Sequence, residues 1–251
     1  MDLASILLAV GGGFLGGAMN ALAGGGSFAT MPALIALGLP ATNANATSNF
    51  AVLPGAAASA LTFRDELAPV GGARPRVLGT ITFLTALIGS ALLVITPTNT
   101  FDHIIPWLLL FAFIVLLFGK RAAGWLEQRV HIGRKSLFVA QGVLGLYGGY
   151  FGGGIGMMTT AIYGLLAGAT PREMFAVRTL MLAIANSAAA FVFIATGMIA
   201  WSACIPMLIG AFAGGWIAAR LGRRVPPTPI RIWTLAWTAL VTAAFFYRAY
   251  A

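Results

Sequence analysis

The chain has 251 residues, of which 59% are hydrophobic and only 8% are charged, and its mean hydropathy is +0.92. Soluble domains carry about 25% charged residues, so this composition excludes a water-exposed surface and predicts an integral membrane protein in contact with the lipid bilayer. The formal net charge is +9. The basic residues lie in short loops between apolar segments, which is typical of membrane topology and does not indicate a nucleic-acid partner.

Ten apolar segments can be assigned along the chain, and two of them are short. They cover residues 3–23, 27–37, 43–63, 77–96, 104–119, 136–151, 155–167, 174–196, 199–219 and 230–248. A helix needs about 20 residues to cross the hydrocarbon core, so segments 27–37 and 155–167 are too short to span it comfortably. We expect them to be half-helices or re-entrant pieces of an all-α polytopic membrane protein. Met1-Asp2-Leu3 lacks the basic region of a cleavable signal peptide, so the first segment is expected to be retained.

Basic residues predict the orientation, because loops rich in Lys and Arg stay in the cytoplasm. One such loop, 120–135, joins the two halves of the chain, and a second covers 220–231. The loop at 64–76 is a weaker third case, since two acidic residues accompany its arginines. The loop at 97–103 has no Lys or Arg and is expected outside. Both termini are then predicted to lie outside.

The second half of the chain repeats sequence motifs of the first half in the same order. Gly24-Gly25-Gly26 aligns with Gly152-Gly153-Gly154, and each triplet opens one of the short segments. The match continues from Ala44–Thr47 to Ala176–Thr179, and the offset drifts from 128 to 132 residues. Two diverged copies of one unit explain this pattern.

We predict a single membrane domain, 1–251, made of repeat 1 at about 3–120 and repeat 2 at about 136–250. Each repeat holds about five hydrophobic segments, so the number of crossings per repeat is odd and the repeats are expected to be inverted. Inverted repeats with broken helices are the common construction of secondary transporters, whose sites lie at the midplane between the repeats.

Each glycine triplet stands where a short helix begins, and a helix N-terminus presents unpaired N–H groups and a partial positive charge. Glycine lets an anion approach this backbone closely. Two such termini facing each other near mid-bilayer predict an anion site. The alternative is that the glycines serve close helix packing, as the spacing of Gly12/Gly16, Gly13/Gly17 and Gly149/Gly153 allows.

A dense polar cluster opens the segment at 43–63. Part of it caps the helix after Pro40, whereas Thr47 and Asn49 lie deeper and are candidate ligand contacts. In the second half, Arg178 and Thr179 stand in the matching motif. A buried arginine could bind an oxyanion through two hydrogen bonds, or it could extend to the membrane interface. The candidate substrate-binding residues are Gly24, Gly25, Gly26, Ser27, Thr47, Asn49, Gly152, Gly153, Gly154, Arg178 and Thr179.

The sequence offers little for catalysis. The carboxylates and both histidines lie in or next to loops, so neither a membrane-embedded proton relay nor a nucleophile with its base can be assembled. No spacing typical of a metal site is present, and the single cysteine, Cys204, excludes an internal disulfide. We therefore expect no metal, no cofactor and no enzymatic activity.

The motifs together resemble the TauE/SafE sulfite exporter family, the DUF81-type permeases, over about residues 10–245. They are GGG with a short apolar segment containing Pro32, then GLP and A-x-A-T-S, with GGG, TP and A-V-x-T in the second half. The resemblance implies a bacterial inner-membrane carrier that exports sulfite or small organosulfur anions such as sulfonates or sulfoacetate. Arg178 departs from the usual small residue at its position, and it suits a doubly charged or carboxylate-bearing anion.

Three functions remain open at this level. The first is a secondary transporter in which one repeat rocks against the other to expose a small anion to each side in turn. The second is a channel-like anion pore, and the third is a membrane scaffold that transports nothing. The sequence leaves the oligomeric state open, with a homo-oligomer allowed.

Overall fold

A computed structural model describes residues 1–127, 134–167, 171–222 and 227–250. In this part of the chain all the regular elements are helices, apart from one β-bridge between Val70 and Ala73. The elements are α1 (Leu3–Ala23), α2 (Ser27–Ala36), α3 (Ala41–Thr62), the 3-10 turn η1 (Arg64–Glu66), α4 (Pro75–Ile95), α5 (Thr98–Glu127), α6 (Arg134–Tyr150), α7 (Ile155–Ala167), α8 (Pro171–Ala195), α9 (Trp201–Gly222) and α10 (Pro227–Tyr250). Six of them are long and apolar enough to cross a membrane, which confirms the prediction of an all-α polytopic membrane protein.

The fifth predicted segment, 104–119, is much too short, because α5 runs over 30 residues from Thr98 to Glu127. Most of the predicted loop 97–103 and the first part of the loop 120–135 are therefore helical; residues 128–133 lie outside the described residues. Hydropathy missed these turns because a helix that extends beyond the hydrocarbon core no longer needs apolar side chains.

The basic stretch 220–231 is also partly helical. Arg220 lies in the last turn of α9, and Arg231 lies within α10, where its Nη2 donates to the Leu117 carbonyl oxygen over 3.1 Å. Arg223 and Arg224 lie outside the described residues. Arg231 therefore ties α10 to α5 instead of occupying a loop.

Glycines bring α1 and α9 into direct backbone contact. A Cβ on Gly13 would clash with the Met207 carbonyl oxygen, and a Cβ on Gly17 would clash with that of Ala211. Both contacts advance in the same direction along the two helices, so α1 and α9 run parallel. The packing interpretation of the Gly13/Gly17 spacing is thus supported.

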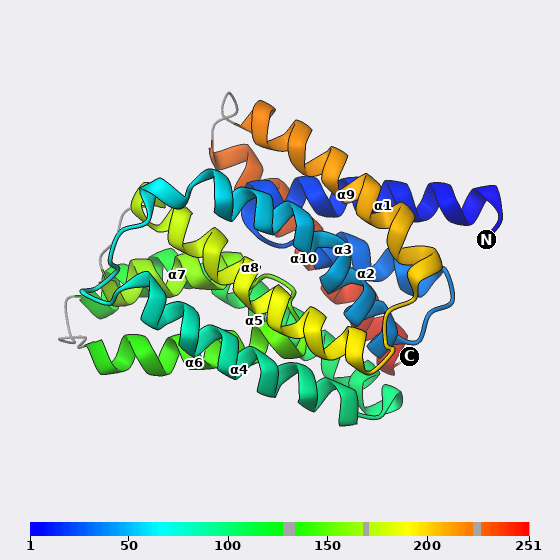
Figure 1. Ribbon diagram of the computed structural model, residues 1–251, viewed down its shortest axis with the longest axis horizontal. Helices are drawn as coiled ribbons and strands as arrows, with labels where there is room; N and C mark the ends of the chain where they lie inside the picture. The colour runs from blue at the N-terminus through cyan, green and yellow to red at the C-terminus, as the bar shows by residue number, and fades with distance from the viewer. Residues whose placement is uncertain (128–133, 168–170, 223–226, 251) are drawn as a thin grey trace.

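Helices α4 and α6 are joined in the same way. A Cβ on Gly89 would clash with the Leu146 carbonyl oxygen, and a Cβ on Gly149 would clash with that of Ala86. Figure 1 shows α1 and α9 along one edge of the molecule and α4 and α6 along the opposite edge. Under the predicted repeat, α1 corresponds to α6 and α4 to α9. A helix of each repeat therefore packs against a helix of the other, α1 on α9 and α6 on α4. Inversion of the halves relative to the membrane stays a prediction.

Helices α3 and α8 pass antiparallel through the middle of the protein. At one end the Phe63 and Phe175 rings meet edge to face with their centroids 4.9 Å apart, and at the other the Asn43 side chain donates to the Met198 carbonyl oxygen over 3.0 Å. Small residues line this crossing, including Ala56 on α3 and Ala188 on α8. Because protein surrounds most of α3, its polar residues avoid lipid.

Candidate functional site

The first glycine triplet breaks the chain between α1 and α2. Gly24 adopts a left-handed conformation with φ of 80°, and its N–H donates to the Met19 and Asn20 carbonyl oxygens. This conformation is strained for residues with a Cβ, which explains why glycine stands at this position. Helix α2 then folds back along α1, with Thr30 against Gly16 and Ala33 against Gly12.

The second triplet, between α6 and α7, begins with the same geometry, although its third glycine, Gly154, is left-handed with φ of 77° whereas Gly26 is right-handed. Gly152 has a φ of 73°, and its N–H donates to the Tyr147 carbonyl oxygen, five residues earlier, as Gly24 does to Met19. The Tyr147 hydroxyl donates to the Gly153 carbonyl oxygen over 2.9 Å and stabilises the break. The short segments are thus helices of 10 and 13 residues that start directly after the glycines, as predicted.

The two breaks touch each other inside the protein. A Cβ on Gly24 would lie 2.8 Å from the Gly156 Cα, and one on Gly25 would lie 2.6 Å from the Met157 Cε. The beginnings of α2 and α7 therefore lie side by side. In the described part of the chain, no acceptor is found for the backbone N–H groups of Gly25–Ser27 or of Gly153–Ile155. The arrangement concentrates unpaired N–H groups and two positive helix ends in a buried place.

Asn49 lies against the second break. Its side chain is 1% exposed, and a Cβ on Gly152 would lie 2.6 Å from the Asn49 Nδ2. Neither Oδ1 nor Nδ2 has a hydrogen-bond partner among the described residues. Val52, almost one turn further along α3, packs on Gly26 of the first break instead. Helix α3 thus offers a polar side chain to one break and an apolar one to the other.

Asn45 lies one turn before Asn49 on the same face of α3. Its Nδ2 donates to the Tyr150 carbonyl oxygen over 2.9 Å, which satisfies a free carbonyl group at the end of α6. Its Oδ1 is buried without a partner in the described part of the chain. Asn45 therefore fixes the second break and at the same time presents an acceptor beside it.

Thr47 and Ser48 serve neighbouring helices. The Ala200 N–H donates to the Thr47 hydroxyl over 3.0 Å, so Thr47 caps the start of α9. The Ser48 hydroxyl pairs with that of Thr30, which also bonds the Gly26 carbonyl oxygen. Ser27 is buried in the first turn of α2. Thr47 is thus directed towards α9, away from the breaks.

Arg178 and Thr179 lie far from Asn49. The Arg178 side chain is 9% exposed, and its guanidinium lies 4.7 Å from the Phe175 ring centroid. Since α3 and α8 are antiparallel and Phe63 meets Phe175, Arg178 and Asn49 are roughly 16 Å apart along the bundle, three helical turns. The Thr179 hydroxyl bonds the Phe175 and Ala176 carbonyl oxygens of its own helix.

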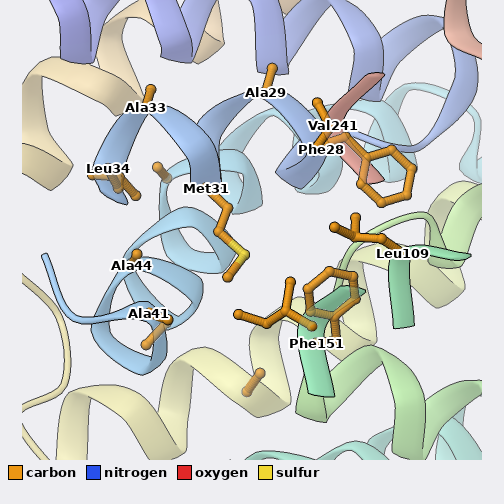
Figure 2. Packing of buried hydrophobic residues seen from close by; sticks show 14 of the residues in the cluster. Phe28, Ala29, Met31, Ala33, Leu34, Ala41, Ala44, Leu109, Phe151 and Val241 are labelled. Carbon is orange, nitrogen blue, oxygen red and sulfur yellow. The ribbon is translucent and has the colours of Figure 1, made fainter. Parts of the chain in front are cut away.

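Aromatic side chains that the sequence did not single out cover both breaks. A Cβ on Gly25 would lie 3.1 Å from the Phe28 Cδ2, and one on Gly154 would lie 2.8 Å from its Cζ. Phe151 packs on Gly153 in the same apolar cluster, which Figure 2 shows from close by. The Trp237 indole N–H donates to the Phe28 carbonyl oxygen over 3.1 Å. Many other aromatic residues stand in similar, mostly apolar stretches of the chain, so the sequence gives no signal that distinguishes these three.

These features define a multi-pass membrane protein in which two short helices begin side by side in the interior. The family model described as sulfite exporter TauE/SafE matches residues 9–245, and the chain belongs to this family. The names of the family and of the relatives indicate a membrane transporter rather than an enzyme.

Several curated relatives match almost the whole chain. The probable membrane transporter protein YfcA of Escherichia coli strain K12 is 26% identical over 234 residues, 93% of this chain and 86% of the relative. A probable membrane transporter protein of Haemophilus influenzae is 28% identical over 251 residues, 98% of this chain and 96% of the relative. The probable membrane transporter protein ORF9 of a Sinorhizobium species is 29% identical over 217 residues, 82% of this chain and 79% of the relative. No solved structure matches the chain.

Proposed function

We propose that this protein is a secondary transporter in the bacterial inner membrane that exports a small sulfur-containing anion, such as sulfite, a sulfonate or sulfoacetate. The observation that carries the proposal is the contact between Gly24 and Gly156, which brings the beginnings of α2 and α7 together. The family description adds the sulfur chemistry.

The charges around the breaks favour an anion. Each helix N-terminus carries about half an elementary positive charge, so the two together offset roughly one negative charge. Unpaired N–H groups at the glycines can donate directly to the oxygens of an oxyanion, because no Cβ keeps the ligand away from the backbone. The acidic residues of the described α-helices, which would repel an anion, lie near helix ends: Asp102 and Glu127 in α5, where Asp102 pairs with Arg248, and Glu173 in α8.

Helix pairing suggests which parts move during alternating access. Backbone contact at glycines joins α1 to α9 and α4 to α6, which favours moving bodies that combine helices from both repeats over a movement of residues 3–120 as a unit against 136–250. We propose that one moving body contains α1, α2 and α9 and the other α4, α6 and α7. Their boundary contains the Gly24–Gly156 contact and the crossing of α3 and α8, where small residues permit sliding.

Flux into proteoliposomes tests the proposal. Purified protein is reconstituted and the movement of radiolabelled sulfite, sulfate, taurine and sulfoacetate is measured with and without a pH gradient. We expect saturable movement of at least one of these anions above empty liposomes, and the Gly55→Ala variant, whose new Cβ meets no atom within 4 Å, should retain it. Movement of only a cation or a neutral solute would exclude the anion proposal.

Two competing functions make different predictions. An anion channel would give single-channel currents in a planar bilayer and a flux that does not saturate. A scaffold would neither move nor bind any of the four anions. Saturable flux without single-channel currents distinguishes the carrier from both.

A further inference from the structure

The side chains of Asn45 and Asn49 form a second element of the candidate site. Both are buried, at 0% and 1% exposure, and lie one turn apart on the face of α3 that meets the end of α6. Three of their four polar atoms have no partner among the described residues: the Asn45 Oδ1 and both polar atoms of Asn49. Buried polar groups are normally paired, so these atoms indicate a ligand at this place.

The chemistry of these atoms restricts the ligand. A side-chain amide contains two N–H donors on the nitrogen and an oxygen that only accepts. The Asn45 orientation is fixed, because its Nδ2 donates to the Tyr150 carbonyl oxygen and a flipped amide would set two acceptors against each other. The Oδ1 atoms of Asn45 and Asn49 therefore both need a donor, while the backbone N–H groups beside Gly152 and the Asn49 Nδ2 need acceptors.

A fully deprotonated oxyanion has acceptors only and would leave the Asn45 Oδ1 unpaired. A monoanion that keeps one O–H or N–H group satisfies both kinds of atom. Its single negative charge also matches the roughly one positive charge that two helix N-termini supply. The buried cation that could balance a second negative charge, Arg178, lies about three helical turns away along α8.

We infer that Asn45 and Asn49 select oxyanions that retain a hydrogen-bond donor, so that hydrogensulfite is taken in preference to the sulfite dianion or sulfate. This inference rests on the proposed function and names the substrate form that the site accepts. The proton then crosses the membrane covalently attached to the substrate, and no side chain has to titrate. The asparagines act as specificity-determining contacts at the second break.

Two probes of equal charge and similar size isolate the donor. Sulfamate and methanesulfonate are both monoanions with three sulfonate oxygens, but sulfamate has an NH₂ group where methanesulfonate has a methyl group. Each competes at fixed pH with radiolabelled sulfite flux in proteoliposomes of the full chain. We expect the inhibition constant of sulfamate to be about tenfold lower or more, because a site built to pair a donor rejects an analogue that lacks it.

A variant assigns this discrimination to Asn49. In Asn49→Leu, which keeps a similar volume without polar atoms, we expect the ratio of the two inhibition constants to fall about threefold or more towards one, because one of the two acceptors for the ligand's donor is removed while the Asn45 Oδ1 remains. The matched control is Asn43→Leu on the same helix, which should keep the wild-type ratio because Asn43 bonds Met198 away from the breaks.

The outcomes separate the two proposals. Equal inhibition constants in the wild-type protein would overturn the inference, and this comparison needs no variant to fold. A preference for sulfamate that is undiminished in Asn49→Leu would overturn the assignment to Asn49. If sulfite does not move but another of the four anions does, the inference about hydrogensulfite is overturned and the proposed function stands. The absence of flux for all four anions would instead contradict the proposed function.

Discussion

The two glycine breaks begin with the same left-handed glycine, but they differ at the third glycine, where Gly154 is left-handed and Gly26 is right-handed, and in their surroundings. Gly24 and Gly152 both end a long helix in a left-handed conformation and make the same backbone hydrogen bond. At the first break Val52 lies on Gly26 and Met157 on Gly25, and the hydroxyl of Thr30, which bonds the Gly26 carbonyl oxygen, is paired with Ser48. At the second break the amide of Asn49 lies on Gly152 and has no partner among the described residues. A glycine motif thus creates the helix break. The residues of the helix packed on the break then determine whether it serves helix packing or presents polar atoms for a ligand.

The largest effect on stability and transport is expected from a substitution at the first break. In Gly24→Ala the new Cβ would meet the Gly156 backbone at 2.8 Å, and the left-handed φ of 80° adds strain. Strain of about 1–2 kcal/mol and overpacking of about 1–3 kcal/mol should lower the thermal midpoint in detergent clearly and abolish flux. Gly55→Ala is the control, and an unchanged midpoint in Gly24→Ala would contradict the close contact of the breaks.

At the second break we expect a substitution to lower the rate of transport more than the thermal stability. In Gly152→Ala the Cβ meets a side-chain atom, the Asn49 Nδ2, which can move aside, so the loss of thermal midpoint should be smaller than for Gly24→Ala. Flux should nevertheless fall about tenfold, since both the approach to the backbone and the position of Asn49 change. An equal fall of the thermal midpoint in Gly24→Ala and Gly152→Ala would contradict the proposed difference between a tightly packed first break and a ligand-binding second break.

A smaller effect tests whether the polar residues of α3 divide into structural and ligand-binding ones. Thr47→Val removes the hydroxyl that caps α9, and the free energy of unfolding should fall by about 1 kcal/mol. The ratio of sulfamate to methanesulfonate inhibition should stay at its wild-type value, because Thr47 is directed to α9. A changed ratio of inhibition constants would mean that Thr47, like Asn49, contributes to substrate selection.

The smallest effect on substrate affinity is expected at Arg178. Since Arg178 lies about three turns from Asn49, the concentration of sulfite that half-saturates flux should change by less than about twofold in Arg178→Gln. Stability is the more sensitive readout, because the Arg178 guanidinium packs on the Phe175 ring. A severalfold loss of affinity would mean that Arg178 contacts the anion directly.

Local features of the fold were predictable and distant relations were not. Hydropathy located the ten helices, and the triplets at Gly24 and Gly152 located the breaks, because glycine alone adopts a left-handed conformation without strain. The length of α5 escaped prediction, since its polar end residues resemble a loop. The separation of Arg178 from Asn49 also escaped it, because the aligned motifs lie at opposite ends of two antiparallel helices.

The sequence by itself determined the membrane class and the two breaks, because transfer of apolar residues into lipid and the backbone preference of glycine are local properties. Only the tertiary structure decided that α1 packs on α9 and α4 on α6, that the two breaks touch, and that Asn49 rather than Thr47 faces one of them. These relations depend on which helix faces which, and contacts between residues about 60 to 200 positions apart set that arrangement.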